Sequence, residues 1–545
     1  MSRLSLAAVV AVQLAALLAV SALVGDHGWD DGTITVAFSR TFARAGVIAL
    51  TPLSEIVEGF SSVSWFLLNA AVGLARPSFQ GAIFASQALA ILSIGATTVL
   101  LARACALLGL DRFWTTLTVL TFAAWGCSFA EASNGMEMGL LAAAVLLLVG
   151  ELLSPRPRAP LLVLGVIVAV ATRFEAILYV ALLGLTAVSV PRRRAFWIIA
   201  VTATVTLAAL TGGRWMVFSD VLPNTFWAKR WPPYAGFGAG RLLAALELPG
   251  LLVAPLLALL IARWRRWLSW GAWRTHRRSL LVLAAPVAGA VLMGFAVGEH
   301  WGYRGRMPYF AFPVALLALA RLSASTERAA DKGRRRGAIV VSLVTVGLSL
   351  TAFPWGELGA ARKGAGEFGV SPHTYAESGE VFRRFTAAAA LPHGRVLTPD
   401  VGGLALCCDE FRIVDLGFLS NRRLAHGGPL ALAEVLPAEA PELIEAHWEW
   451  ASATRLYELP YFRDHYRPAF AGGTKLWLRR DVARAIEDKG LGCSVPQSRP
   501  DLQEALRRHR YAGHDLPADR AAFASSGVVF TLAQADAVMG KNPCR

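Results

Sequence analysis

Long apolar runs recur through the first two thirds of this chain and constrain its fold more than any other feature. Each run, at about 18 residues or more, is long enough to cross the hydrocarbon core of a bilayer. Only 17% of the 545 residues are charged, whereas a soluble protein of this length carries about 25%. The chain is therefore expected to be an α-helical polytopic membrane protein. About 11 transmembrane helices are predicted, at 4–24, 80–102, 113–130, 135–152, 159–172, 174–190, 195–212, 248–262, 279–297, 307–322 and 338–354.

Clusters of arginine stand between these runs and orient the chain. Two of them are Arg192–Arg194 and Arg334–Arg336. Because Lys and Arg are enriched in cytoplasmic loops, the clusters and the N-terminus are predicted to be cytoplasmic. The net charge of +15 is thus read as a topology signal, and no nucleic-acid partner is expected. The expected location is the bacterial inner (plasma) membrane, multi-pass, with the C-terminal residues on the periplasmic, extracytoplasmic side.

The composition changes after about residue 354. Short strand-like runs such as GRVLTPD, FRIVDLG and TKLWLRR then alternate with helical stretches such as AESGEVFRRFTAAAA. Residues 355–545 are therefore expected to form a soluble, mixed α/β periplasmic domain that follows a transmembrane domain at 1–354. Cys493 and Cys544 lie in this polar part, where an oxidising compartment would allow them to form a disulfide.

The first periplasmic loop is predicted at 25–79 and contains a second apolar segment. This segment, 61–76, is too short to span the bilayer. It is expected to be an interfacial helix, with Trp65 at the level of the headgroups.

Two adjacent carboxylates, Asp30 and Asp31, stand at the mouth of the first predicted span. Ionisable groups near membrane depth are costly, so they point to function. A carboxylate could take the proton from an acceptor hydroxyl or support positive charge at the anomeric carbon of a sugar. Adjacent residues cannot both face one point unless the backbone turns, so one is expected to act and the other to support it. Alternatively, the pair could hold a divalent cation through hard oxygen ligands.

Six segments, in order from about 29 to 426, resemble the arabinofuranosyltransferase B-like family. The stretch WDDGTITVAFSRTFARAGVIALTPLSEIVEGFSSVSWFLL is similar to the family's first outer loop. SDVLPNTFWAKRW is similar to its PNTyyAK loop, which is the most distinctive match. The others are NGMEMGLLAAAVLLL, ATRFEAILYVALL, EHWGYRGRMPYFAFPVALL and GRVLTPDVGGLALCCDEFRIVDLGFLSNRRLAH.

The resemblance implies the GT-C glycosyltransferase fold, with a helical membrane bundle, interfacial helices in the first outer loop and a C-terminal periplasmic domain. It also implies a polyprenyl-phosphate sugar donor, which in known members is decaprenyl-phosphate arabinofuranose. The acceptor in the family is cell-wall arabinan, and a related class transfers arabinofuranose to pilin. This chain departs from the family pattern at GEHWGYRGR, where an Asp is expected, and at Thr51-Pro52, where Asn-Pro is expected. These departures put the identity of the sugar in question more than the reaction.

The expected function is transfer of D-arabinofuranose from a polyprenyl-phosphate donor to a glycan acceptor of the cell envelope, at the periplasmic face. Asp30 and Asp31 are the expected catalytic residues. Cations at the outer surface suit a phosphate. The predicted donor- and substrate-binding residues are Arg173, Lys229 and Arg306 for the phosphate, Glu137, Glu175, Asn224 and His300 for the sugar, and Glu58 as a brace of the loop.

Three alternatives remain open from the sequence. The acceptor could be a protein such as pilin. The chain could instead be a lipid flippase or secondary transporter, although such proteins often show internal repeats and mid-membrane polar residues. A scaffold for envelope assembly would need the acidic pair to be dispensable. In the soluble domain, Asp400, Asp415 and the nearby glycines are expected to serve strand ends and turns, and Trp448, Trp450 and Trp477 to stack on sugars or fill the core.

Overall fold

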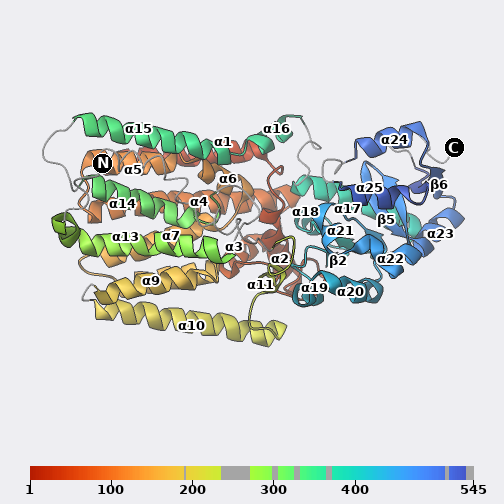
Figure 1. The fold of residues 1–545 in the computed structure, drawn as a ribbon, viewed down its shortest axis with the longest axis horizontal. Helices are drawn as coiled ribbons and strands as arrows, with labels where there is room; N and C mark the ends of the chain where they lie inside the picture. Colours follow the sequence, from red (N-terminus) through yellow and green to blue (C-terminus); the bar gives the residue numbers. More distant parts are fainter. Residues whose placement is uncertain are drawn as a thin grey trace.

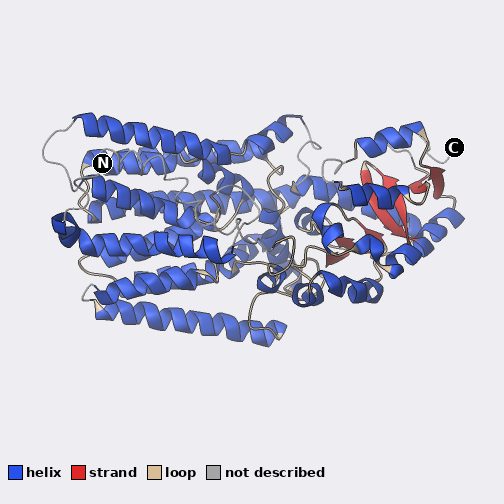
Figure 2. Ribbon diagram, viewed as in Figure 1, coloured by secondary structure: helices blue, strands red, loops and turns tan. Residues whose placement is uncertain are grey.

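The computed structural model describes residues 1–75, 77–189, 192–234, 270–297, 305–324, 332–363, 371–509 and 515–534. Long helices lie side by side in one part of the molecule, and a sheet flanked by shorter helices forms the other part (Figures 1 and 2). The predicted first periplasmic loop, residues 25–79, is called the first outer loop below. Its helix α2 (Asp31–Ala45) lies where the two parts meet, together with α11 (Asn224–Ala228) and α18 (Gly402–Cys407) (Figure 1).

Within the described residues, five helices are long and apolar enough to cross a membrane. Two shorter helices, α5 and α6, pass the same test together and are bent by 44° between them. The exposed apolar side chains of α1, among them Leu4, Val12 and Leu23, form a surface suited to lipid. The long helices are α1 (Arg3–Val24), α4 (Phe79–Leu107), α10 (Arg193–Phe218), α13 (Trp270–Val297) and α15 (Lys332–Ser349), and the bent pair is α5 (Arg112–Ala123) and α6 (Gly126–Asn134).

Four shorter apolar helices also fall on predicted spans, and each packs against neighbouring helices of the bundle. They are α7 (Met138–Leu153), α8 (Ala159–Thr172), α9 (Ala176–Ser189) and α14 (Phe312–Ala324), which follows the 3-10 turn η1 (Tyr309–Ala311). Helix α7 is apolar on all sides and buries almost all of its residues between neighbours that include α4 and α8, as expected of a central helix. The predicted span at 248–262 lies outside the described residues.

The first outer loop contains two helices, α2 (Asp31–Ala45) and α3 (Val63–Gly73). Helix α2 ends at Gly46, whose φ of 72° is left-handed and suits glycine. The expectation that Trp65 lies among lipid headgroups was wrong, because its side chain is only 1% exposed. Its indole N–H donates to the Gly135 carbonyl oxygen at 3.1 Å, which gives the ring a polar partner inside the protein. On the same helix, the side chain of Leu67 is far more exposed than that of Trp65.

The second part, made by the described residues from 371 to 534, is built on a seven-stranded mixed sheet with the strand order β2-β1-β3-β5-β4-β7-β6. We call it the soluble part, after the soluble domain that the sequence predicts there. Strands β2, β1 and β3 are parallel, whereas β4 and β5 form an antiparallel hairpin. The predicted mixed α/β character is thereby confirmed. The strands are β1 (Arg395–Thr398), β2 (Arg412–Asp415), β3 (Leu443–Ile444), β4 (Tyr466–Ala471), β5 (Thr474–Arg479), β6 (Gly492–Pro496) and β7 (Val528–Leu532).

Shorter helices connect these strands and join the two parts. Among them, α17 begins with Ser371 as its N-cap, whose side chain accepts the N–H of Thr374. They are α11 (Asn224–Ala228), α16 (Trp355–Lys363), α17 (Pro372–Ala389), α18 (Gly402–Cys407), α19 (Arg422–Gly427), α20 (Leu432–Glu439), α21 (Trp448–Ala453), α22 (Pro460–His465), α23 (Arg480–Asp488), α24 (Pro500–Arg507), α25 (Pro517–Ala524) and the 3-10 turns η2 (Leu350–Ala352), η3 (Pro429–Ala431) and η4 (Leu456–Glu458).

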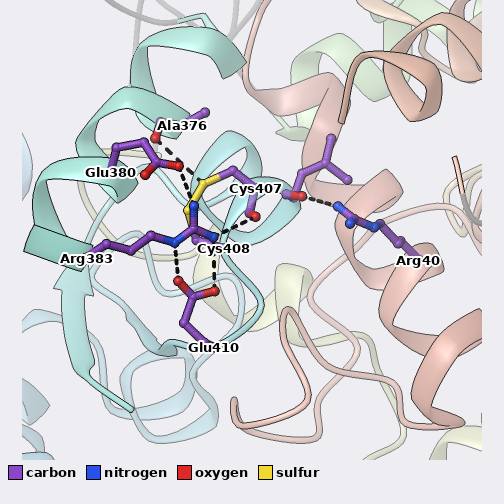
Figure 3. Close-up of a disulfide and its surroundings, with 8 residues drawn as sticks. Arg40, Ala376, Glu380, Arg383, Cys407, Cys408 and Glu410 are labelled. Carbon is purple, nitrogen blue, oxygen red and sulfur yellow. Dashed lines mark hydrogen bonds and ion pairs between the residues drawn. A yellow bond between two sulfur atoms is a disulfide. The ribbon is translucent and has the colours of Figure 1, made fainter. Parts of the chain in front are cut away.

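Two tryptophans considered for sugar stacking are core residues of the soluble part. Trp450 and Trp477 are 7% and 5% exposed. The side chain of Trp448 lies outside what the structure describes, and so does Cys544, so the predicted disulfide with Cys493 stays a prediction. Cys407 and Cys408, adjacent in sequence, form a disulfide with each other (Figure 3).

Replacing Trp477 with alanine is expected to cost about 3–5 kcal/mol of stability, because it removes a large buried ring that packs against Phe462 and Phe523. The thermal unfolding midpoint of the detergent-solubilised protein should fall by several degrees. Leu430→Ala, at a side chain that is 75% exposed, is the control and should leave the midpoint unchanged. Equal midpoints for both variants would contradict this assignment of the core.

Candidate functional site

The Asp30 carboxylate lies between the first outer loop and the soluble part. Its Oδ2 accepts the backbone N–H of Gly402 at 2.9 Å and its Oδ1 accepts that of Gly403 at 2.5 Å. The Thr33 hydroxyl also donates to Oδ1, at 3.2 Å. Asp30 is 7% exposed. Burial raises its pKa to about 7, and the nearby Asp400 carboxylate adds to the rise, whereas the two backbone N–H groups oppose it.

Asp31 is the first residue of α2, and its side chain points to a different partner. Its carboxyl group is 41% exposed, and Oδ2 accepts a hydrogen bond from Nη1 of Arg306 at 3.2 Å. The two adjacent carboxylates therefore meet separate groups, Asp30 the soluble part and Asp31 a cation beside the bundle. Each carboxylate thus has a protein partner of its own, and a divalent cation shared by the pair stays a prediction.

Among the residues that the structure describes, a second set of side chains lies close enough together to be considered as a metal site. Glu380, Cys407 and Cys408 bring their ligand atoms within 4.8 Å of one another. The two sulfurs are joined in a disulfide, however, and Arg383 donates to Glu380 (Figure 3). A disulfide offers no thiolate ligand, and the guanidinium repels a cation, so this set does not fit a metal.

Predicted phosphate- and sugar-site residues come together around Asp31. Arg173 pairs with Glu137 at 2.6 Å and with Glu175 at 3.6 Å. Lys229 lies close enough to Arg173, Glu175, Arg306 and Asp31 for its charge to interact with theirs. We refer to these six residues as the charged cluster: Asp31, Glu137, Arg173, Glu175, Lys229 and Arg306.

Lys229 is the exposed cation of the charged cluster. It follows α11, in the PNTFWAK stretch. Although its side chain is accessible, the surrounding protein removes enough water to lower its pKa to about 8, and the positive charge of Arg173 adds to that effect. An ammonium group that is accessible and incompletely solvated suits a phosphate, because the anion restores the solvation that the cation lacks.

Two other predicted residues lie outside the charged cluster. The Glu58 carboxylate accepts two hydrogen bonds from Arg214, at 2.6 and 3.0 Å, and both side chains are buried. The Asn224 amide donates to the Leu419 carbonyl oxygen at 2.7 Å, and so contacts the soluble part. His300, also predicted to line the sugar site, lies outside the described residues.

Several groups that shape this region were not predicted from the sequence. Arg214 was missed because it lies within the apolar run of α10. Asp26 was also missed, although it contacts His373 of α17 at 3.2 Å. The glycine pair Gly402-Gly403 was expected to serve a turn. Two consecutive glycines in the short loop between a strand and a helix are a signal of close backbone approach, and that signal could have located them.

Glu58→Ala is expected to destabilise the protein by about 3–5 kcal/mol, because it leaves the Arg214 guanidinium buried without its carboxylate. In a double-mutant cycle with Arg214→Ala, the double variant should lose less stability than the sum of the two single variants. Thermal unfolding in detergent measures both. The exposed pair Glu504–Arg507 is the control, with an expected coupling below about 1 kcal/mol. Additive losses at Glu58 and Arg214 would contradict the pairing.

Comparison with known proteins bears on the fold. No protein-family model matches the sequence, and no curated protein matches it. Among solved structures, the chain is similar to ArnT from Cupriavidus metallidurans in the apo state, with 12% identity, a TM-score of 0.53, and coverage of 86% of this chain and 97% of ArnT. It is also similar to the Archaeoglobus fulgidus oligosaccharyltransferase tethered with an acceptor peptide (9% identity, TM-score 0.47, 86% of this chain and 74% of that one). A third similarity is to ArnT bound to undecaprenyl phosphate (16% identity, TM-score 0.41, 78% of this chain and 79% of that one). The chain therefore has the GT-C fold, an α-helical polytopic membrane bundle with a C-terminal mixed α/β region.

Proposed function

We propose that this chain is a membrane glycosyltransferase that moves a sugar from a polyprenyl-phosphate donor to an acceptor at the outer face of the bacterial inner membrane. One observation carries the proposal. A half-exposed carboxylate, Asp31, lies beside Arg306 and within charge interaction of Lys229, at the outer end of a helical bundle with the GT-C fold. An acid beside cations is what transfer from a phosphate-linked donor requires.

Three cations of the charged cluster, Arg173, Lys229 and Arg306, hold the phosphate in different ways. Arg173 is 4% exposed and is fixed by Glu137, so it supplies a stationary positive charge. Lys229 is accessible and reaches the phosphate as a point charge. When the bond between the anomeric carbon and the phosphate oxygen breaks, negative charge grows on the leaving polyprenyl phosphate. Fixed cations stabilise that charge without having to reorganise.

Asp31 is the proposed general base. The acceptor hydroxyl attacks the anomeric carbon as the phosphate leaves, and its proton passes to the Asp31 carboxylate. Arg306 holds that carboxylate through Oδ2, which leaves Oδ1 to face the acceptor. The carboxylate also lies near the positive charge that develops on the sugar in the transition state.

For the sugar, we propose D-arabinofuranose carried on decaprenyl phosphate, with an envelope glycan such as arabinan as the acceptor. The support is the ordered resemblance of six segments to the arabinofuranosyltransferase B-like family, with PNTFWAK at 223–229 as the most distinctive. A pilin-like protein is the second candidate acceptor, because the same resemblance extends to enzymes that modify pilin.

The placement of the acidic residues favours an enzyme over a flippase or a secondary transporter. A transporter would hold its polar residues near the middle of the membrane. Asp30 and Glu137 instead stand directly before helices, at the N-cap positions of α2 and α7. Glu137 also lies against Arg173, which is the C-cap of α8. These residues therefore gather where helices begin and end.

Asp31→Asn is expected to lower kcat by about 100-fold or more, because the amide cannot accept the proton, while KM for the donor stays within about threefold. The assay is transfer from decaprenyl-phosphate arabinofuranose to a short synthetic arabinan by detergent-solubilised protein. Asp409→Asn is the matched control, since Asp409 is an exposed aspartate that pairs with Arg44, near the end of the helix that Asp31 begins. Unchanged transfer by Asp31→Asn would remove this residue from the mechanism.

The pH dependence tests Lys229 separately. Its pKa is lowered to about 8, so the ammonium is charged below that pH and loses its charge above it. We expect kcat/KM for the donor to fall as the pH rises through about 8. Lys229→Arg should abolish that decline, because a guanidinium stays charged. The same decline in the arginine variant would show that another group causes it.

A further inference from the structure

We propose that the Gly402-Gly403 backbone of the soluble part is a positioning element of the reacting centre: it holds Asp30, and through Asp30 it fixes the direction of Asp31. The inference rests on the proposed function in so far as Asp31 is the base. It assigns Asp30 as a positioning residue in place of the catalytic role predicted from the sequence, and it gives the soluble part a role in the reaction.

The contact requires glycine at both positions. A Cβ atom at residue 402 would lie 2.4 Å from the Thr33 hydroxyl oxygen and 2.6 Å from the Asp30 carbonyl oxygen. At residue 403 it would lie 2.1 Å from the Pro372 carbonyl oxygen. All three distances are far below van der Waals contact, and the neighbours include backbone atoms that cannot simply rotate away. The α18 backbone therefore lies directly against the first outer loop at Gly402 and directly against the start of α17 at Gly403.

Helix α18 is itself held at its other end. It finishes at Cys407, whose disulfide to Cys408 packs against Gly379 of α17, where a Cβ atom would lie 2.5 Å from the Cys408 sulfur. Arg383 donates to the Cys407 carbonyl oxygen at 3.2 Å, and Arg40 of α2 donates to the Leu406 carbonyl oxygen (Figure 3). The N–H groups offered to Asp30 thus come from a helix with little freedom to move.

The other side of the acidic turn is held by the bundle. The Trp29 N–H donates to Oδ1 of Asn134 at 2.6 Å. A Cβ atom at Gly32 would lie 2.0 Å from the Asn134 carbonyl oxygen. Residues 29–33 are therefore fixed between the end of α6 and the start of α18. Since Asp31 is the central residue of that segment, these contacts determine where its carboxylate points.

Asp30 is poorly placed to act on substrate directly. It is 7% exposed, and both of its oxygens already accept backbone N–H groups. Asp31, by contrast, is 41% exposed and faces the charged cluster. A buried Asp30 with both oxygens bonded is expected of a positioning residue, and an accessible Asp31 is expected of a reacting residue.

Amide hydrogen exchange of the full-length protein in detergent tests the contact without any substrate. In Asp30→Ala, the amides of Gly402 and Gly403 should exchange at least about tenfold faster, because their hydrogen-bond acceptor is gone. Asp31→Ala is the matched control and should leave the Gly402 and Gly403 amides protected. Unchanged exchange in Asp30→Ala would overturn the proposal.

Transfer assays with the same donor and arabinan separate positioning from chemistry. Gly402→Ala should lower kcat by about 10-fold or more with the donor KM little changed, because the reacting groups remain but are misaligned. Gly359→Ala, where a Cβ atom meets nothing, should behave like the wild type. If Gly402→Ala does not fold, Asp30→Asn replaces it, because it keeps one acceptor oxygen and should retain part of both the protection and the activity.

Two outcomes separate this inference from the proposed function. Loss of transfer in Asp30→Asn with exchange as in the wild type would mean that Asp30 acts chemically, and would overturn the positioning role while leaving the glycosyltransferase standing. Absence of transfer by the wild type would count against the proposed donor. The exchange result would still decide whether the glycine pair holds Asp30.

Discussion

An ionised group at the edge of a membrane bundle is costly unless it is paired, and this constraint organises the end of the bundle that meets the sheet part. Glu137 with Arg173 and Glu58 with Arg214 satisfy it as buried pairs at 2.6 Å. Once these pairs are made, the accessible charges that remain include Asp31 and Lys229. The buried pairs therefore act as a fixed frame, and the accessible charges are the ones available to a substrate.

The soluble part completes that frame. In sheets with parallel strands, ligand contacts are usually made beyond the carboxyl ends of the strands. Strands β2, β1 and β3 are parallel, and the loop after β1 leads through Asp400 to the glycines that contact Asp30. Asn224 makes a second connection, from the start of α11 to the Leu419 carbonyl oxygen. The edge of the sheet that would hold a ligand in a soluble enzyme here holds the first outer loop of the bundle.

Much of the fold could be predicted from the sequence, because it depends on patterns that one segment carries by itself. Apolar runs marked the helices, and strand-like runs such as FRIVDLG marked β2. Trp65 was misplaced because an apolar segment too short to span can lie either at the interface or inside the protein. Only the position of the Gly135 carbonyl oxygen decides between the two.

The site was predictable in its residue types but not in its pairings. Asp31, Arg173, Lys229 and Arg306 were selected because charges beside apolar sequence are unusual, and they do come together. The division of roles between Asp30 and Asp31 depends on Gly402 and Gly403, more than 370 residues away in sequence. A contact between residues so far apart has no signal in the local sequence. Where two backbones approach closely, the sequence shows only that the residues there are glycines.

We propose that the charged cluster receives the phosphate of a polyprenyl-phosphate donor. Structure determination of the protein with decaprenyl phosphate tests it most directly. We expect the phosphate oxygens to lie within hydrogen-bonding distance of Lys229 and of Arg173 or Arg306, with the lipid chain along the apolar surface of the bundle. A phosphate bound elsewhere, or a charged cluster left empty at saturating lipid, would contradict the account.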